Sequence, residues 1–186
     1  MLKRFIPVLL AAAFFTFNAS SQVFLTRNGK VTFFSKAPVE NIQAVNNEIT
    51  SVLDTKKGEF QFGVLIKSFK FKKALMEEHF NENYLESNTY PKANFKGMIA
   101  DIKKVDFTKE GNYTVTVNGD LMIHGVTKKI AVPGTITVTA GKIAATATFN
   151  VNIKDYNIKI PSTLVNNIAE TVDVSVDCKY DPYKKG

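Results

Sequence analysis

The chain has 186 residues, of which 45% are hydrophobic, and carries a formal net charge of +7 at pH 7. This length and composition fit one globular domain and exclude an intrinsically disordered protein. The lysines stand in scattered pairs without interleaved aromatic residues, so we expect a solvated basic surface and no nucleic-acid partner.

The N-terminal segment has the layout of a secretory signal peptide. Two basic residues precede an apolar run from Phe5 to Phe17, and the small residues Ala19 and Ser21 then stand two apart. The run is shorter than the roughly 20 residues that a helix needs to cross a bilayer. We therefore expect residues 1–21 to be removed on export, so that residues 22–186 form one β-barrel domain. The mature protein would be periplasmic or secreted and would have no transmembrane anchor.

Alternation of apolar and polar residues dominates the chain from Val31 onward, which predicts one strand after another. In the long run 59–71 the apolar positions shift by one after Ile66, and we expect a bulge or bend near Lys67 and Ser68. Further alternating runs are separated by short turns, which favours antiparallel pairing: 113–124, 130–138, 143–153 and 171–180.

About eight strands with one apolar face each leave two architectures, a sandwich or a barrel with an apolar inner wall. Several of the runs are longer than a typical strand of about five or six residues, which favours closure. The sequence therefore predicts an all-β fold, an extended antiparallel β-barrel.

The segment 72–91 interrupts the strand pattern. Leu75, Met76, His79 and Phe80 fall at helical spacing, which predicts a short amphipathic helix over about residues 72–80. A polar, turn-rich stretch follows as far as Pro91. We expect the helix and this loop to lie across one opening of the barrel.

Two stretches of the sequence resemble the YceI-like family of exported bacterial proteins. The matching residues are His79-Phe80, Tyr84, Tyr90-Pro91 and Phe95 in the first stretch and Gly119, Leu121 and Gly125 to Lys128 in the second. The resemblance implies a lipocalin-like barrel that holds a long apolar lipid in an inner channel, such as a polyisoprenoid or its quinone or pyrophosphate form. It also implies a binding or carrier protein, often linked to stress tolerance, with no catalytic centre.

The candidate ligand-binding residues fall into two groups. Inward strand positions and the apolar helix face would form the channel: Phe33, Phe60, Phe62, Val64, Ile66, Phe69, Phe71, Leu75, Met76, Phe80, Phe95, Val115, Val117, Leu121, Phe149 and Val151. Polar residues of the helix and loop would form the mouth, namely His79, Asn83, Tyr84 and Tyr90, with Asn81, Asn88 and Lys92 as further head-group donors. The small inward residues Gly119, Ala145 and Ala147 can leave a channel, and a closely packed core is the alternative.

No residue set has the arrangement of a catalytic or metal site. His79 and His124 are the only histidines and belong to different elements, and Cys178 has no cysteine partner. Glu77 and Glu78 are adjacent on the predicted helix and point about 100° apart, which does not suit a pair of catalytic carboxylates. We therefore expect no enzyme activity, no metal and no cofactor.

Two hypotheses follow from the sequence. The first is a carrier of an apolar lipid held in the barrel. The second is a structural or stress-related interaction protein with a packed core, whose helix and 81–91 loop dock a partner. A homodimer is compatible with both hypotheses.

Overall fold

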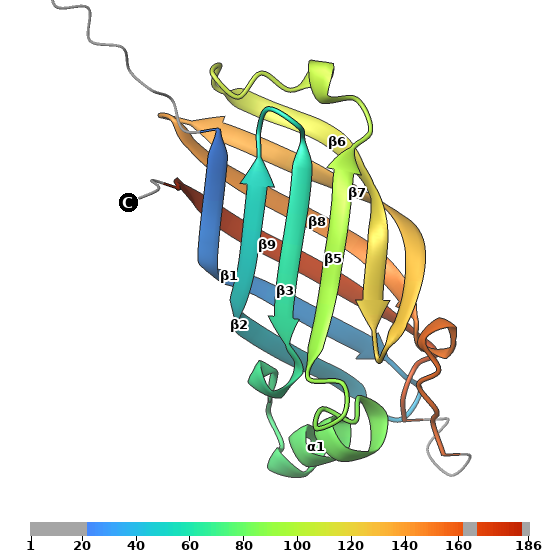
Figure 1. Cartoon of the computed structure of the whole chain (residues 1–186). Helices are drawn as coiled ribbons and strands as arrows, with labels where there is room; N and C mark the ends of the chain where they lie inside the picture. Colours follow the sequence, from blue (N-terminus) through green and yellow to red (C-terminus); the bar gives the residue numbers. More distant parts are fainter. Residues whose placement is uncertain (1–21, 162–166, 184–186) are drawn as a thin grey trace, which may run out of the picture.

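The computed structural model describes residues 22–161 and 167–183, so the predicted signal peptide lies outside the described residues. These residues form the closed antiparallel β-barrel that the alternation predicted (Figure 1). The strands are β1 (Val23–Lys36), β2 (Asn41–Asp54), β3 (Glu59–Leu65), β4 (Lys70–Phe71), β5 (Lys92–Ile99), β6 (Gly111–Ile123), β7 (Val126–Thr139), β8 (Lys142–Asn152) and β9 (Thr171–Pro182). The helical elements are α1 (Ala74–His79), a π-helical turn η2 (Phe80–Tyr84), and the 3-10 turns η1 (Ile66–Ser68), η3 (Ile102–Lys104) and η4 (Ile153–Tyr156).

The barrel closes because β1 pairs with strands from both ends of the chain. It is antiparallel to β2 along one edge and to β9 along the other, so the ring runs β1-β2-β3-β5-β6-β7-β8-β9. The short β4 continues the ring beyond η1, because it pairs with β2 on the same edge as β3. Every long strand therefore has neighbours on both edges, and each apolar face points inward.

Strand β6 shows how the alternation produces this interior. Val115, Val117 and Leu121 are each 8% exposed and point inward. Thr114 and Thr116, which alternate with them, are exposed on the outer wall. A shift of one residue in register would exchange the two sets, so the apolar pattern fixes the register of the strand.

Strands β5 and β6 approach closely at a pair of glycines. Gly97 and Gly119 are direct partners in the register, and the Phe95 ring lies over both. A Cβ atom on Gly119 would come 2.4 Å from the Lys96 carbonyl oxygen and 2.6 Å from the Gly97 Cα. Gly119 therefore allows two backbones to approach, and it does not open the interior as the sequence suggested.

The long run 59–71 is not one strand. Strand β3 ends at Leu65, the turn η1 changes the direction of the chain, and β4 then pairs Phe71 with Ala44 of β2. The bend expected near Lys67 and Ser68 is confirmed. The turn η1 interrupts the pairing with β2, which resumes at Lys70 of β4, and the chain reaches α1 only after β4.

The predicted helix is present, but it begins two residues later and continues further. It starts at Ala74 and runs through η2 to Tyr84, where the sequence suggested a loop. The Asn81 side-chain amide donates a hydrogen bond of 2.8 Å to the Glu77 carbonyl oxygen, and the wider π-helical turn places the Leu85 N–H on the Phe80 carbonyl. The spacing of apolar residues along the sequence does not reveal such local hydrogen bonds, so it did not predict the extension beyond Phe80.

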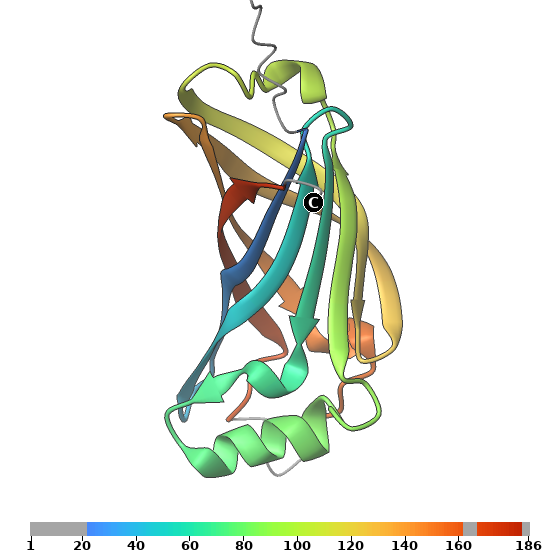
Figure 2. The same cartoon turned by 60° about the vertical axis from the view of Figure 1, so that its left-hand side comes forward.

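We call residues 74–84, that is α1 and η2, the helical cap. The cap lies across one end of the barrel, below the strand ends in Figure 2. A salt bridge of 2.7 Å joins Lys70 of β4 to Glu77 of the cap, and the same Lys70 lowers the pKa of the Glu77 carboxyl. Within the described residues, no helix has the length and apolar character needed to cross a membrane.

The opposite end of the barrel is filled with side chains. Leu53, Phe60, Ile136, Ile143 and Tyr180 are each at most 3% exposed and belong to one packed cluster. The hydroxyl groups of Tyr180 and Ser51 share a buried hydrogen bond of 2.8 Å. This end is therefore a conventional close-packed core.

We expect Gly119→Ala to destabilise the protein by about 1 to 3 kcal/mol, because the added methyl group must push β5 and β6 apart. The matched control is Gly63→Ala in β3, where a Cβ atom would meet nothing closer than 3.9 Å. We expect that control to change the free energy of unfolding by less than about 0.5 kcal/mol. Urea unfolding of both variants checks this, and equal effects would contradict the close approach.

Cys178 should be unreactive in the native protein. Its side chain is fully buried, and burial raises the pKa of the thiol to about 12. We expect iodoacetamide at pH 8 to alkylate the denatured chain and leave the folded chain unmodified, as measured by intact mass. Alkylation of the folded chain at the rate of the denatured one would contradict the burial.

The same shift predicts how stability depends on alkaline pH. The folded chain holds the thiol proton up to about pH 12, whereas an unfolded thiol loses it near about pH 8.5. The protonated thiol therefore makes its full contribution to stability below about pH 8.5. The free energy of unfolding should fall as the pH rises from about 8.5 to about 12. Burial also raises the pKa of Tyr180, which acts in the same direction.

Candidate functional site: an apolar cavity beneath the helical cap

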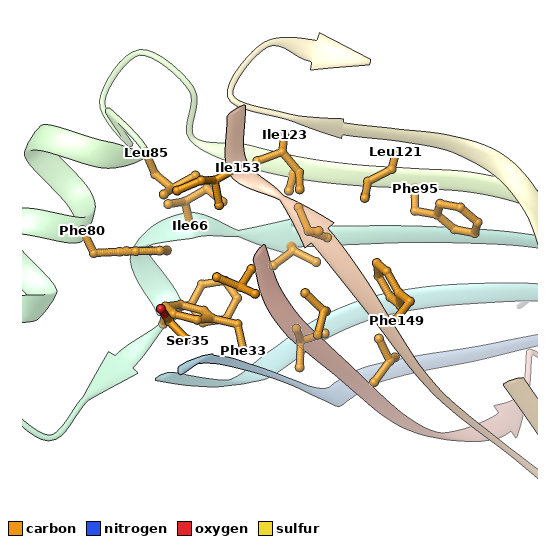
Figure 3. Close-up of a pocket in the computed structure, with 18 of the residues that line it drawn as sticks. Phe33, Ser35, Ile66, Phe80, Leu85, Phe95, Leu121, Ile123, Phe149 and Ile153 are labelled. Carbon is orange, nitrogen blue, oxygen red and sulfur yellow. The ribbon is translucent and has the colours of Figure 1, made fainter. Parts of the chain in front are cut away.

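Between the helical cap and the packed end, the barrel encloses a cavity of about 520 Å³. Its walls come from all eight strands of the ring, and the cap covers one end. Figure 3 shows Phe80 and Leu85 near the cap, with Leu121, Phe95 and Phe149 deeper in the barrel. The lining is almost entirely aliphatic and aromatic, so the cavity suits an apolar occupant.

Four phenylalanines, Phe33, Phe69, Phe71 and Phe80, attach the cap to the barrel wall, and Phe80 is at their centre. Its ring stacks on Phe33 of β1 at a centroid distance of 5.4 Å. It also contacts Phe69 at 5.6 Å and Phe71 at 5.0 Å, both at steep interplanar angles. Aromatic pairs at these distances contribute about 0.5 to 1.5 kcal/mol beyond the area they bury. Phe80 is therefore the main apolar anchor of the cap.

Several polar groups of the lining lie near the cap, and others, Asn94, Thr135 and Thr146, come from β5, β7 and β8. Ser35 is 1% exposed, and its hydroxyl oxygen accepts a hydrogen bond of 2.9 Å from the Ala169 backbone N–H. Lys73, just before α1, forms a salt bridge with Glu40 at the β1–β2 turn, and both residues line the cavity. These side chains are partly exposed, so the mouth of the cavity lies between this turn and the cap.

All sixteen residues that the sequence proposed for the channel line this cavity: Phe33, Phe60, Phe62, Val64, Ile66, Phe69, Phe71, Leu75, Met76, Phe80, Phe95, Val115, Val117, Leu121, Phe149 and Val151. Of the small residues expected to leave space, Ala145 lines the cavity and Ala147 and Gly119 do not. Leu75 lines the mouth and remains 60% exposed. The period-2 and helical patterns thus identified much of the wall.

The predicted mouth residues divide into two groups. His79 and Tyr84 line the cavity, and burial raises the pKa of the Tyr84 hydroxyl. Asn83 is exposed and outside the lining, and the Tyr90 ring packs edge-on against His124 at 4.4 Å. The further donors Asn81, Asn88 and Lys92 are also outside the lining, and Asn88 accepts a hydrogen bond from Lys67.

His124 connects the 86–90 loop to the barrel rather than to the cavity. Its Nδ1 lies 3.2 Å from the Tyr156 carbonyl oxygen, which can only accept a hydrogen bond. Its Nε2 lies 3.3 Å from a carboxylate oxygen of Glu86. The histidine has a positive φ of 49°, at the tight turn between β6 and β7. It is a partly buried hydrogen-bonding residue.

Several wall residues were not identified from the sequence. They come from β7, β9 and the segment after β8: Val132, Ile136, Ile158, Ile160, Ile168, Val172, Val174 and Val176. The alternation in β7 and β9 marked all five of the positions on these strands as inward facing, and only the channel assignment was missing. Ile158, Ile160 and Ile168 lie outside any strand, so periodicity gave no signal for them. Among the described residues, no three His, Cys, Asp or Glu side chains come together as a metal site would require.

Comparison with known proteins places this architecture in a family. The family model described as the YceI-like domain matches residues 14–180. Among curated proteins, none matches the sequence significantly.

Several solved structures share the fold. A polyisoprenoid-binding domain from Saccharophagus degradans, implicated in plant cell wall breakdown, has a TM-score of 0.73 at 17% identity over 88% of this chain and 99% of that one. BcnA from Burkholderia cenocepacia has a TM-score of 0.66 at 19% identity over 82% of this chain and 96% of that one. The YceI protein of Campylobacter jejuni has a TM-score of 0.58 at 17% identity over 79% and 88%. At these identities the likeness establishes a common fold.

We expect Phe80→Ala to release the cap from the barrel. The variant should lose about 1.5 to 3 kcal/mol of stability, because a half-buried aromatic side chain is removed from its contacts with three other phenylalanines. Hydrogen exchange should accelerate most strongly over residues 74–84. Asn83→Ala, an exposed change in the same segment, is the control and should leave exchange unchanged. Unaltered exchange in Phe80→Ala would show that other contacts hold the cap.

Proposed function

Because this chain belongs to the YceI-like domain family, we propose that it binds an apolar lipid of the polyisoprenoid or isoprenoid-quinone class in the barrel cavity and carries it without altering it chemically. The observation that supports this most directly is the 520 Å³ cavity with its apolar lining. The family resemblance noted in the sequence is confirmed by the match over residues 14–180.

The cavity needs an explanation because protein interiors are normally close-packed. A void of this size leaves its lining without partner atoms on one side, and that loss of contacts is destabilising. An apolar ligand would restore the contacts and remove further apolar surface from water. Each buried methylene group is worth about 0.8 kcal/mol, so binding needs no specific polar contact along the tail.

The similarity to a polyisoprenoid-binding domain supports the choice of ligand class. A branched, flexible hydrocarbon chain also suits a wall built from aliphatic and phenylalanine side chains, which present no regular array of polar groups. The polar groups near the mouth, Lys73, His79 and Tyr84, can contact a hydroxyl, quinone or phosphate head group there. We place the head group at the mouth and the tail in the interior.

The competing hypothesis required a packed core beneath a docking helix. The cavity of about 520 Å³ beneath the cap argues against the packed core and supports the carrier hypothesis. We also propose that the protein works in the periplasm or outside the cell, on the basis of its N-terminal sequence pattern. Intact mass of the exported protein tests this, with a chain beginning at Gln22 as the expected result.

The binding proposal is tested with two glutamine substitutions on β8. Phe149 lines the cavity, whereas Thr148 is exposed on the outer wall of the same strand. In titrations with a prenyl alcohol, Phe149→Gln should weaken binding at least about tenfold, because it removes apolar contact and places an amide against the tail. Thr148→Gln should bind as the unsubstituted protein does. Failure of the folded protein to bind any prenyl alcohol or quinone would contradict the proposal, and equal affinities of the two variants would contradict the location.

A further inference from the structure

Ser35, near the end of β1, is the only buried polar residue among the described residues that line the cavity. Its hydroxyl oxygen accepts the hydrogen bond from the Ala169 backbone N–H, and this hydroxyl makes no other hydrogen bond within the described part of the chain. A serine hydroxyl can also donate its own proton, so one buried donor is left for an occupant of the cavity. Figure 3 places Ser35 beside Phe33, close to the cap.

The lysine and the carboxylate at the mouth of the cavity balance one another. Lys73 and Glu40 form a salt bridge, and they are the only lysine, arginine, aspartate or glutamate residues among the described lining. The neighbouring Lys70 and Lys72 are exposed and lie outside this lining. Burial raises the pKa of the Tyr84 hydroxyl, so this group is protonated and neutral at physiological pH. The described lining therefore offers hydrogen-bonding groups without an excess of lysine or arginine over acidic residues.

This balance of charges does not suit an anionic head group. A terminal phosphate carries about −1.5 to −2 elementary charges at pH 7, and proteins bind such groups with charge-assisted hydrogen bonds from arginine or lysine. Here the one lysine of the described lining is already paired, and the Glu40 carboxylate would face the same phosphate. A hydroxyl or carbonyl oxygen carries no net charge and needs only a donor such as Ser35. Bringing it against the apolar wall therefore costs much less desolvation.

Resting on the proposed function, we propose that the cavity selects a lipid with a neutral oxygen head group over the phosphorylated form of the same lipid. The Ser35 hydroxyl donates a hydrogen bond to the head-group oxygen, and the Glu40 carboxylate repels a phosphate at the mouth. One head group can meet both residues, because Ser35 pairs with Ile42, two residues after Glu40. Ser35 and Glu40 are then specificity-determining residues that distinguish lipids with the same tail.

The role of Glu40 is tested with two ligands that share one tail, geranylgeraniol and geranylgeranyl diphosphate. In a competition followed by native mass spectrometry at about 0.15 M salt, the unsubstituted protein should prefer the alcohol at least about tenfold. Glu40→Gln removes the carboxylate and frees Lys73, so the ratio should move about tenfold toward the diphosphate. The control Glu78→Gln removes the same charge from an exposed position of the cap outside the lining. It should move the ratio less than about twofold, because salt screens exposed charges over about 8 Å.

The role of Ser35 is tested with geranylgeraniol and the matched hydrocarbon that lacks the hydroxyl group. Ser35→Ala should weaken binding of the alcohol about three- to tenfold, the value of one hydrogen bond, and should leave binding of the hydrocarbon unchanged. Ser35→Thr keeps the hydroxyl and should restore the affinity for the alcohol. Equal losses for both ligands in Ser35→Ala would show that the hydroxyl acts only through its hydrogen bond to Ala169, which overturns its role as a donor to the head group.

The outcomes separate this inference from the function it rests on. A diphosphate that binds as tightly as the alcohol, or a ratio that moves equally in Glu40→Gln and Glu78→Gln, overturns the head-group selection and leaves lipid binding intact. Protein that is folded by circular dichroism and binds neither the alcohol nor the diphosphate overturns the proposed function and the head-group selection together.

Discussion

The structure depends on one constraint, the pairing of β1 with both β2 and β9, which closes the sheet. Each long strand has a single apolar face, and a closed ring is an arrangement in which all of these faces meet one another without a second layer. In a closed ring the number of strands, here eight, sets the width of the interior. Whether that interior is solid or hollow is then decided by the volumes of the inward side chains.

The two ends of this barrel differ in how far side chains fill the interior. Toward the β2–β3 turn, Tyr180, Phe60, Leu53 and their neighbours fill the interior, and a buried hydrogen bond fixes the tyrosine. Toward the cap, the inward side chains stop short of one another, and the phenylalanine cluster around Phe80 covers the opening instead of filling it. The chain thus stabilises the barrel at one end and keeps the cavity at the other, where a ligand can enter.

The sequence predicted the wall better than the rim for a physical reason. Inward positions on a strand follow from a period of two, so Phe33, Phe62 and Val117 could be assigned without knowing their neighbours. The rim depends on tertiary contacts: Tyr90 packs on His124, and Asn81 bonds to the turn before it. Neither contact has a periodic signature. The role of Gly119 was also hidden, because it depends on the register that places Gly97 opposite. The cavity itself requires the volumes of side chains from all eight strands together.

The central claim is that the cavity holds an isoprenoid lipid, and its most direct test is the mass of the protein isolated gently from the cells that produce it. Native mass spectrometry, followed by organic extraction and lipid analysis, gives both the stoichiometry and the identity of the bound molecule. The account predicts one prenyl or quinone lipid for each chain, released when the protein is denatured. A ligand-free mass that does not change after incubation with such lipids would contradict it.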